Sequence, residues 1–233
     1  MEKKKIKIYD LIDIPYIRDK YSKIGEGWID NKIELHDGKQ FYKVSTIMRA
    51  KPPHKNHIAM LEALCQKSEH LAINIGSANV LDHKNPFYPH ETEEMLRLGL
   101  KGKYNNFSII PIPDFYDKVK GDGSGDRKWT EYLFEKNPNF TEFISNNDWV
   151  TDLLKPRMYD EKGNKKFDII FPPQILPEKD MLYVNGIYIC ATEVRKAMVN
   201  DGQWEKFLLP EIADYIKENN LVERVKKLCK GKV

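Results

Sequence analysis

The stretch that decides the fold of this chain is Met48-Arg49-Ala50-Lys51-Pro52-Pro53-His54-Lys55-Asn56-His57. An apolar run ends at Met48, a double proline follows, and residues 57–67 have the apolar spacing of a helix. The pattern predicts a strand, a tight turn and a helix. Two histidines three residues apart share one face of the first helical turn, where free backbone N–H groups and the helix dipole favour an anion. We interpret the pair as a polyphosphate site; the alternative is an ordinary cap beside a surface histidine.

A second helix start, far along the chain, favours the phosphate interpretation. The sequence Ile189-Cys190-Ala191-Thr192-Glu193-Val194-Arg195 opens a helix with a hydroxyl and a guanidinium three residues apart. Thr192 and Arg195 can then reach the same anion from the side opposite the histidines. Two helix starts with such side chains are less expected by chance than one.

The two motifs together resemble those of the nucleotidyltransferase superfamily related to the class I synthetases. The nearest resemblance is to the archaeal-type nicotinamide-nucleotide adenylyltransferases, whose first motif reads G-R-F-Q-P-F-H-x-G-H and whose distal motif reads x-S-x-T-x-x-R. The resemblance extends from about residue 45 to about residue 230. It includes Ile75-Gly76-Ser77-Ala78, Asn85-Pro86-Phe87, Ile109-Ile110-Pro111-Ile112-Pro113-Asp114 and Leu209-Pro210-Glu211.

Strands that alternate with helices predict an α/β protein whose parallel sheet is flanked on both faces. The resemblance implies the Rossmann-like, doubly wound nucleotidyltransferase fold. Further strands are expected at 71–75, 107–112, 141–144 and 167–171, with a helix at 89–100 and closing helices over 212–229. We expect a nucleotidyltransferase domain over 45–233 that includes these C-terminal helices.

Residues 1–44 lie outside the resemblance and form an expected N-terminal extension. Asp37-Gly38-Lys39 lies between two strand-like arms and predicts a β-hairpin. The second arm is expected to continue into the central strand. The alternative is that the extension makes an oligomer contact.

Composition limits the class of protein. The chain has 233 residues, 41% of them hydrophobic and 31% charged, which fits one soluble domain with additions. We expect a cytoplasmic protein without a membrane span or signal peptide. The net charge of +3 is spread along the chain and predicts no general nucleic-acid interface. Three widely separated cysteines suggest neither disulfides nor a zinc site.

The resemblance implies direct in-line attack of nicotinamide mononucleotide on the α-phosphorus of ATP, which gives NAD and pyrophosphate without an enzyme nucleophile. It assigns catalysis to His54, His57 and Arg195. The implied ATP-binding residues are Arg49, His54, His57, Cys190, Thr192 and Arg195. A Mg²⁺ ion would be held through the ATP phosphates and water, so no protein metal cluster is expected. The family is commonly homo-oligomeric, and a homo-oligomer is implied here.

The implied mononucleotide-binding residues are Gly76, Ser77, Lys84, Asn85, Phe87 and Trp129. Gly76 and Ser77 follow a strand at the edge where open α/β sheets bind ligands, or else form a plain turn. Lys84 stands where the family has a basic residue, and Thr92 where it has an arginine. Trp129 would stack on the nicotinamide ring, or alternatively pack a helix against the sheet. The segment before it, 117–128, has the composition of a flexible insertion.

Three departures from the family pattern count against an unmodified enzyme. Met48 and Asn56 replace motif glycines, and Cys190 replaces a serine whose hydroxyl is a stronger donor. These departures keep two alternatives open: a nucleotidyltransferase for another phosphate acceptor, such as a pantetheine phosphate, or a polyol phosphate with CTP, and a non-catalytic nucleotide-binding protein. A tRNA synthetase fragment is disfavoured because no K-M-S-K-S-like loop is present.

Overall fold

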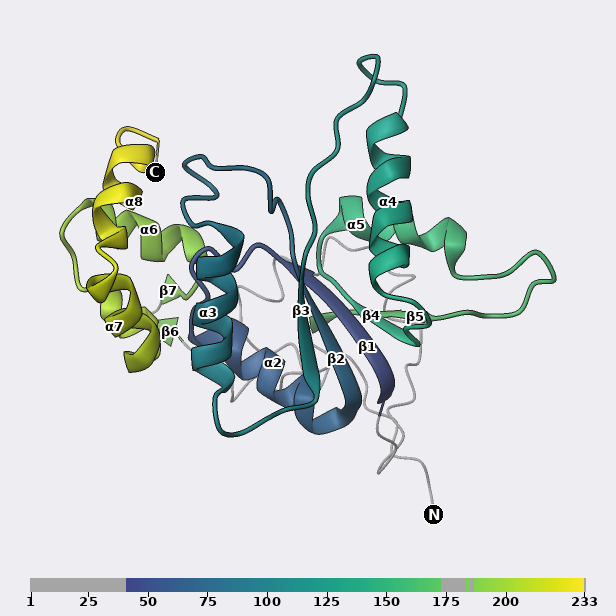
Figure 1. Cartoon of the computed structure of the whole chain (residues 1–233), viewed down its shortest axis with the longest axis horizontal. Helices are drawn as coiled ribbons and strands as arrows, with labels where there is room; N and C mark the ends of the chain where they lie inside the picture. Colours follow the sequence, from purple (N-terminus) through teal and green to yellow (C-terminus); the bar gives the residue numbers. More distant parts are fainter. Residues whose placement is uncertain (1–40, 173–182, 185–186, 233) are drawn as a thin grey trace.

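The computed structural model describes residues 41–172, 183–184 and 187–232, and its centre is a five-stranded parallel sheet (Figure 1). Its strands are β1 (Phe41–Met48), β2 (Ser68–Ile75), β3 (Phe107–Pro111), β4 (Glu142–Ile144) and β5 (Asp168–Ile170), in the order β3-β2-β1-β4-β5. The central strand is therefore β1, and it ends at Met48 as predicted. Met48 lies beside Ile75 in the β1–β2 register, so both strands end at the same edge of the sheet.

Helices follow the strands along the chain. They are α2 (Lys55–Lys67), α3 (Pro89–Leu100), α4 (Ser124–Lys136), α5 (Asp148–Leu154), α6 (Ala191–Val199), α7 (Pro210–Glu218) and α8 (Leu221–Cys229). Short elements complete the described chain: the 3-10 helices η3 (Lys155–Arg157) and η6 (Trp204–Phe207), and the antiparallel pair β6 (Tyr183–Val184) and β7 (Ile187–Tyr188). In Figure 1, α3 and α6 to α8 lie on one side of the sheet and α4 and α5 on the other.

The pleat of β1 sends alternate side chains to two separate cores. Val44 belongs to the larger core, where the sheet meets α2, α3 and the C-terminal helices. Ile47 packs against the smaller core, which contains Trp129 and Leu133 of α4 and Val150 of α5. Successive strand side chains point to opposite faces of the sheet, and here both sets pack against helices. Both faces of the sheet are therefore covered. The predicted doubly wound α/β fold is confirmed.

A buried polar network holds α4 against the sheet. The Asn74 amide donates to Ser45 Oγ at 2.9 Å, and the Asn137 amide, at the end of α4, donates to Asn74 Oδ1 at 2.9 Å. All three side chains are buried, so each of these hydrogen bonds avoids an unpaired polar group. The network fixes α4, and with it Trp129, relative to β1 and β2.

The expectation of a flexible insertion over 117–128 is wrong for residues 124–128, which form the first turn of α4. The Asp117 carboxylate accepts hydrogen bonds from the N–H groups of Gly121 and Gly125, at 2.9 and 3.0 Å. A Cβ atom at Gly125 would lie 2.7 Å from the Phe115 carbonyl oxygen, so glycine is required for this close approach. Glycine and aspartate, which suggested flexibility, here build an ordered turn.

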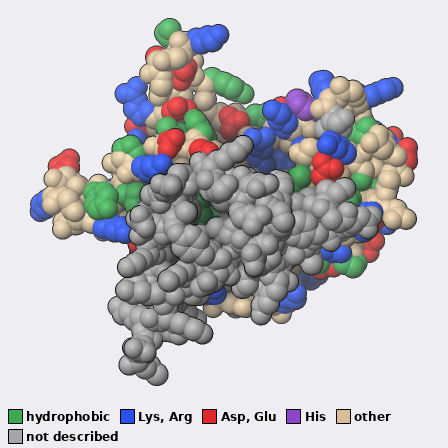
Figure 2. All heavy atoms as spheres, turned by 180° about the vertical axis from the view of Figure 1, so that it is seen from behind, with side chains coloured by type: hydrophobic (Ala, Val, Ile, Leu, Met, Phe, Trp, Pro, Cys, Tyr) green, Lys and Arg blue, Asp and Glu red, His purple; other side chains and the backbone are tan. Residues whose placement is uncertain are grey.

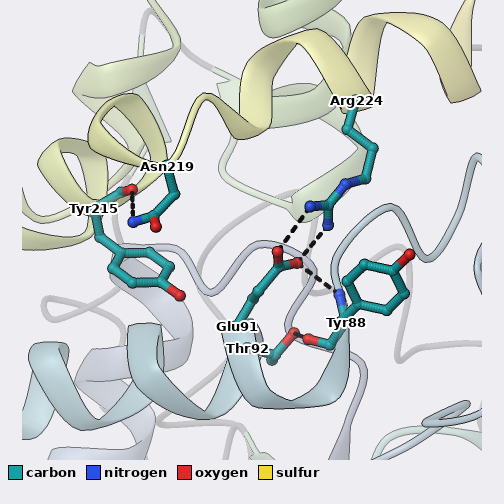
Figure 3. Close-up of polar contacts among 6 residues, drawn as sticks. All are labelled: Tyr88, Glu91, Thr92, Tyr215, Asn219 and Arg224. Carbon is teal, nitrogen blue, oxygen red and sulfur yellow. Dashed lines mark hydrogen bonds and ion pairs between the residues drawn. The ribbon is translucent and has the colours of Figure 1, made fainter.

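An ion pair fastens the C-terminal helices to α3 (Figure 3). Arg224 of α8 donates to both carboxylate oxygens of Glu91, at 2.6 and 2.8 Å, and Glu91 also accepts from the Tyr88 N–H at 2.8 Å. The Glu91 side chain is only 8% exposed, so its charge depends on these donors. The second half of the chain is thereby joined to the strand and helix units of the first half.

The predicted hairpin and most of the expected N-terminal extension lie outside the described residues. The expected boundary between residues 44 and 45 falls inside β1, so Phe41 to Val44 belong to the central strand. The division of the chain at this point stays a prediction.

Candidate functional site

A cavity of about 660 Å³ opens at the carboxyl ends of the strands. Its wall is formed by the ends of β1, β2 and β4, the first turns of α2 and α6, and parts of α4 and α5. The cavity brings together ten of the predicted site residues: Arg49, His54, His57, Gly76, Ser77, Lys84, Trp129, Cys190, Thr192 and Arg195. Figure 2 views the molecule from behind and shows basic side chains gathered near a hollow in the upper part of the picture.

His54 and His57 form a stacked pair at the start of α2. Their ring centroids lie 3.7 Å apart, with an angle of 26° between the ring planes. His54 is the N-cap residue, and its backbone N–H donates to His57 Nδ1 at 3.3 Å. Since Nδ1 of His57 accepts this bond, the neutral ring carries its proton on Nε2 and can donate it to a ligand. His54 Nδ1 is buried and has no partner among the described residues.

Both histidines favour the neutral form. Burial lowers the pKa of His57 to about 4. Burial also lowers the pKa of His54 well below its usual value, and the neighbouring His57 adds to the effect. At neutral pH the pair therefore acts through neutral N–H donors, while the positive charge of the cavity comes from its lysines and arginines.

Arg195 connects the second motif to the first. One guanidinium nitrogen donates to the backbone oxygen of Lys51 at 2.9 Å, and another donates to Thr192 Oγ1 at 3.3 Å. Arg195 is only 6% exposed, whereas Thr192 is exposed at the cavity wall. Cys190 is the N-cap residue of α6 and lines the same wall. The two predicted motifs therefore meet in space.

The departure at Asn56 has a structural explanation. Its amide donates to the backbone oxygen of Ile189 at 3.3 Å, directly before the N-cap of α6. The side chain that replaces a motif glycine thus ties the first turn of α2 to the start of α6. Met48, the other glycine replacement, ends β1, and its backbone oxygen accepts from the Gly76 N–H at 2.9 Å.

Four predicted mononucleotide residues lie at the cavity wall and two do not. Gly76, Ser77, Lys84 and Trp129 line the cavity. Phe87 is fully buried in the larger core, and Asn85 is 4% exposed and bonded to Asp82, so the structure places both behind the wall. An apolar residue after a proline-containing loop can serve the core as readily as a ligand, and the sequence does not separate these two uses.

Trp129 packs a helix against the sheet and also borders the cavity. It is 3% exposed and lies 4.9 Å from Trp149, with ring planes at 58°. Trp149, in α5, is 46% exposed and lines the cavity as well. Of these two tryptophans, Trp149 is therefore the one that exposes aromatic surface to the cavity, and sequence reasoning missed it. The available signal was the position of Trp149 two residues after the polar segment Ser145-Asn146-Asn147, which follows β4.

Two further charged residues of the wall were not predicted. Lys51, inside the first motif, is fully buried, and Asp114 follows β3. Among the described residues that line the cavity, Asp114 is the one carboxylate, against the cations Arg49, Lys51, Lys84 and Arg195. The cavity is therefore suited to an anion with several negative charges.

The described part of the chain offers no metal centre of its own. Among residues 41–172, 183–184 and 187–232, no three His, Cys, Asp or Glu side chains are grouped so that they could hold a metal ion. A search of the same residues finds no helix with the length and hydropathy that a membrane span requires.

Comparison with known proteins places these features in context. No family model matches the chain. A nicotinamide-nucleotide adenylyltransferase from Thermococcus onnurineus is 32% identical over 185 residues, which cover 78% of this chain and 85% of that protein. A protein of the same name from Pyrococcus furiosus is 30% identical over 187 residues, which cover 78% of this chain and 86% of the relative.

A solved structure shares the fold. It is that of a bifunctional NMN adenylyltransferase/ADP ribose pyrophosphatase from Francisella tularensis complexed with AMP and MN ion, with a TM-score of 0.52 and 18% identity. The match covers 81% of this chain and 56% of that one, so this chain spans little more than half of the bifunctional protein.

Proposed function

The chain belongs to the nicotinamide-nucleotide adenylyltransferase family, and we propose that it transfers the adenylyl group of ATP to nicotinamide mononucleotide, which yields NAD and pyrophosphate. The observation that carries this proposal is the stacked His54–His57 pair, which shares one cavity with Arg195. The oxygen of the mononucleotide phosphate forms the new bond to the α-phosphorus as the bond to pyrophosphate breaks. Such a transfer depends on positioning and charge stabilisation rather than on a protein nucleophile.

Different residues contact different phosphates of ATP. The Nε2–H of His57 donates to an oxygen of the α-phosphate, and His54, Arg49, Thr192 and Arg195 hold the remaining phosphates. A neutral imidazole suits this role because it carries one N–H, which it can donate to a phosphate oxygen without any change in its protonation state. Burial makes their hydrogen bonds stronger than they would be in water.

A divalent cation, Mg²⁺ in our proposal, accompanies ATP. The donor set fits an ion held mainly by phosphate oxygens and water, because Asp114 is the single carboxylate that the described residues place at the cavity wall. When bound, the ion neutralises phosphate charge.

The acceptor ring is assigned to the wall formed by Trp129 and Trp149. An electron-poor, cationic nicotinamide ring gains from contact with an indole face, and the exposed Trp149 offers one. Ser77, which follows β2, and Lys84 also line the cavity and would contact the rest of the mononucleotide. Cytoplasmic location and homo-oligomeric assembly stay predictions.

The proposal is tested by an acceptor panel. Purified protein is incubated with ATP, Mg²⁺ and one of three acceptors: nicotinamide mononucleotide, a pantetheine phosphate or a polyol phosphate, the last also with CTP in place of ATP. We expect equal amounts of NAD and pyrophosphate with the first acceptor and little pyrophosphate with the others. Pyrophosphate with another acceptor alone would contradict the assignment, and ATP binding without turnover would identify a non-catalytic nucleotide-binding protein.

A further inference from the structure

Among the described residues of the cavity, Lys51 is the most buried charged side chain. It lies in the turn between β1 and α2 and is 0% exposed, yet it borders the cavity. In the motif that this stretch resembles, glutamine stands at the position of Lys51. A lysine is rarely buried unless its ammonium group meets a partner.

Its contacts connect two walls of the cavity. The Lys51 ammonium donates to the backbone oxygen of Ser77 at 2.9 Å, at the end of β2. The backbone oxygen of Lys51 accepts from Arg195 of α6 at 2.9 Å. The residue therefore lies between the wall that carries the second motif and the wall beyond β2.

The ammonium group is under-satisfied. It carries three N–H donors, and in the part of the chain that the structure describes its one hydrogen-bond partner is Ser77. The charges of Asp114 and Asp82 favour the ammonium form, but among these described residues no carboxylate forms an ion pair with it. Burial outweighs both carboxylates and, with a smaller contribution from Arg49, lowers the pKa of Lys51 to about 8. A bound anion would supply the missing acceptors.

We propose that Lys51 is a further substrate-binding residue, whose ammonium group binds the phosphate of the mononucleotide acceptor beside the ATP phosphates. This inference rests on the proposed function. The ammonium group donates to the backbone oxygen of Ser77, after β2, and the charges of Asp114 and Asp82 act on it. The two reacting phosphates must approach to about 3 Å, and a cation at their junction offsets their mutual repulsion.

The test compares two ligands that differ only in the phosphate. Binding of nicotinamide mononucleotide and of nicotinamide riboside is measured by calorimetry at pH 7 on the wild-type protein and on Lys51→Gln, which restores the family residue. The control is Lys101→Gln, at an exposed turn after α3. We expect Lys51→Gln to weaken mononucleotide binding at least tenfold and to leave riboside and ATP binding within twofold.

Other outcomes overturn the inference. Equal weakening of both ligands would mean that Lys51 only positions the Ser77 loop, and unchanged mononucleotide binding would exclude the contact. Failure of the proposed function is distinguishable, because the wild-type protein would then bind neither ligand and form no NAD.

A pH series on the wild-type protein gives a reading that does not depend on the folding of a variant. The groups facing Lys51 are Asp114, Asp82, Arg49 and Arg195, and carboxylates and guanidinium groups ordinarily titrate outside the range of pH 7 to 9.5. Mononucleotide affinity should fall as the pH rises past about 8, while riboside affinity stays level. A level mononucleotide profile, or the same slope in Lys51→Gln, would contradict the proposal.

Discussion

The two walls of the cavity are built differently. The wall formed by α2 and α6 carries polar side chains on helix starts, joined by the Asn56–Ile189 and Arg195–Lys51 hydrogen bonds between residues more than a hundred positions apart. The wall formed by α4 and α5 presents Trp129 and Trp149, of which the first belongs to a hydrophobic core. The first wall suits charge and the second suits a flat ring. We infer that damage to the first lowers the rate and damage to the second weakens acceptor binding.

The largest expected effect comes from the histidine pair. His57→Ala removes the N–H donor assigned to the α-phosphate, and we expect kcat to fall about 100- to 1,000-fold, as when one preorganised donor is lost. Pyrophosphate release measures the change. The control is His90→Ala, an exposed residue in the first turn of α3. An unchanged kcat in His57→Ala would refute the role in phosphate binding that is assigned to the wall formed by α2 and α6.

Arg195→Lys probes the link between the motifs. Lysine keeps the charge but cannot donate to both Lys51 and Thr192 in the planar geometry of a guanidinium group. We expect a roughly 10- to 100-fold loss of kcat through misplaced phosphates. A small loss of stability, about 1 to 2 kcal/mol, should appear in urea unfolding. Full activity in this variant would show that a point charge is sufficient.

Substitution of each tryptophan should separate binding from stability. Trp149→Ala should raise the KM for nicotinamide mononucleotide about tenfold, with kcat and the KM for ATP little changed, because stacking acts on the acceptor alone. Trp129→Ala should lower the free energy of unfolding by about 3 to 5 kcal/mol, because it empties a buried site. Steady-state kinetics and thermal unfolding distinguish the two. A higher KM for ATP in Trp149→Ala would place the adenine at this wall instead.

The free energy of unfolding should depend on pH through His57, in the wall formed by α2 and α6. The pKa of His57 is lowered from 6.5 to about 4 in the folded protein, so between these values the unfolded chain binds more protons than the folded one. His57 therefore contributes a loss of stability as the pH falls from 6.5 toward 4. Urea unfolding of His57→Asn should show a flatter profile in this window than His90→Asn does. Identical slopes would mean that His57 is hydrated in the folded protein.

The difference between the walls also explains what the sequence could predict. The wall formed by α2 and α6 depends on which residues stand at the helix starts, so His54, His57 and Arg195 were recognisable from local spacing. Lys51 was overlooked because its burial depends on Ser77 and Arg195, which come from distant segments.

The aromatic wall depends on packing between elements. The resemblance to the family implies that Trp129 binds the ligand, yet most of its surface is buried in the smaller core. Trp149 is the exposed tryptophan of this wall. Phe87 was assigned to the mononucleotide and lies in the larger core. The strands were predictable because each carried its own apolar pattern, whereas the side chains that face the cavity depend on how α4 and α5 pack.

The most direct test of the account follows the α-phosphorus. The protein is incubated with nicotinamide mononucleotide, Mg²⁺ and ATP labelled at the α-phosphate, and the products are separated by chromatography. The account predicts that the label appears in NAD and is absent from pyrophosphate. Label that stays in ATP, or that is released as AMP without NAD, would contradict transfer between the two walls.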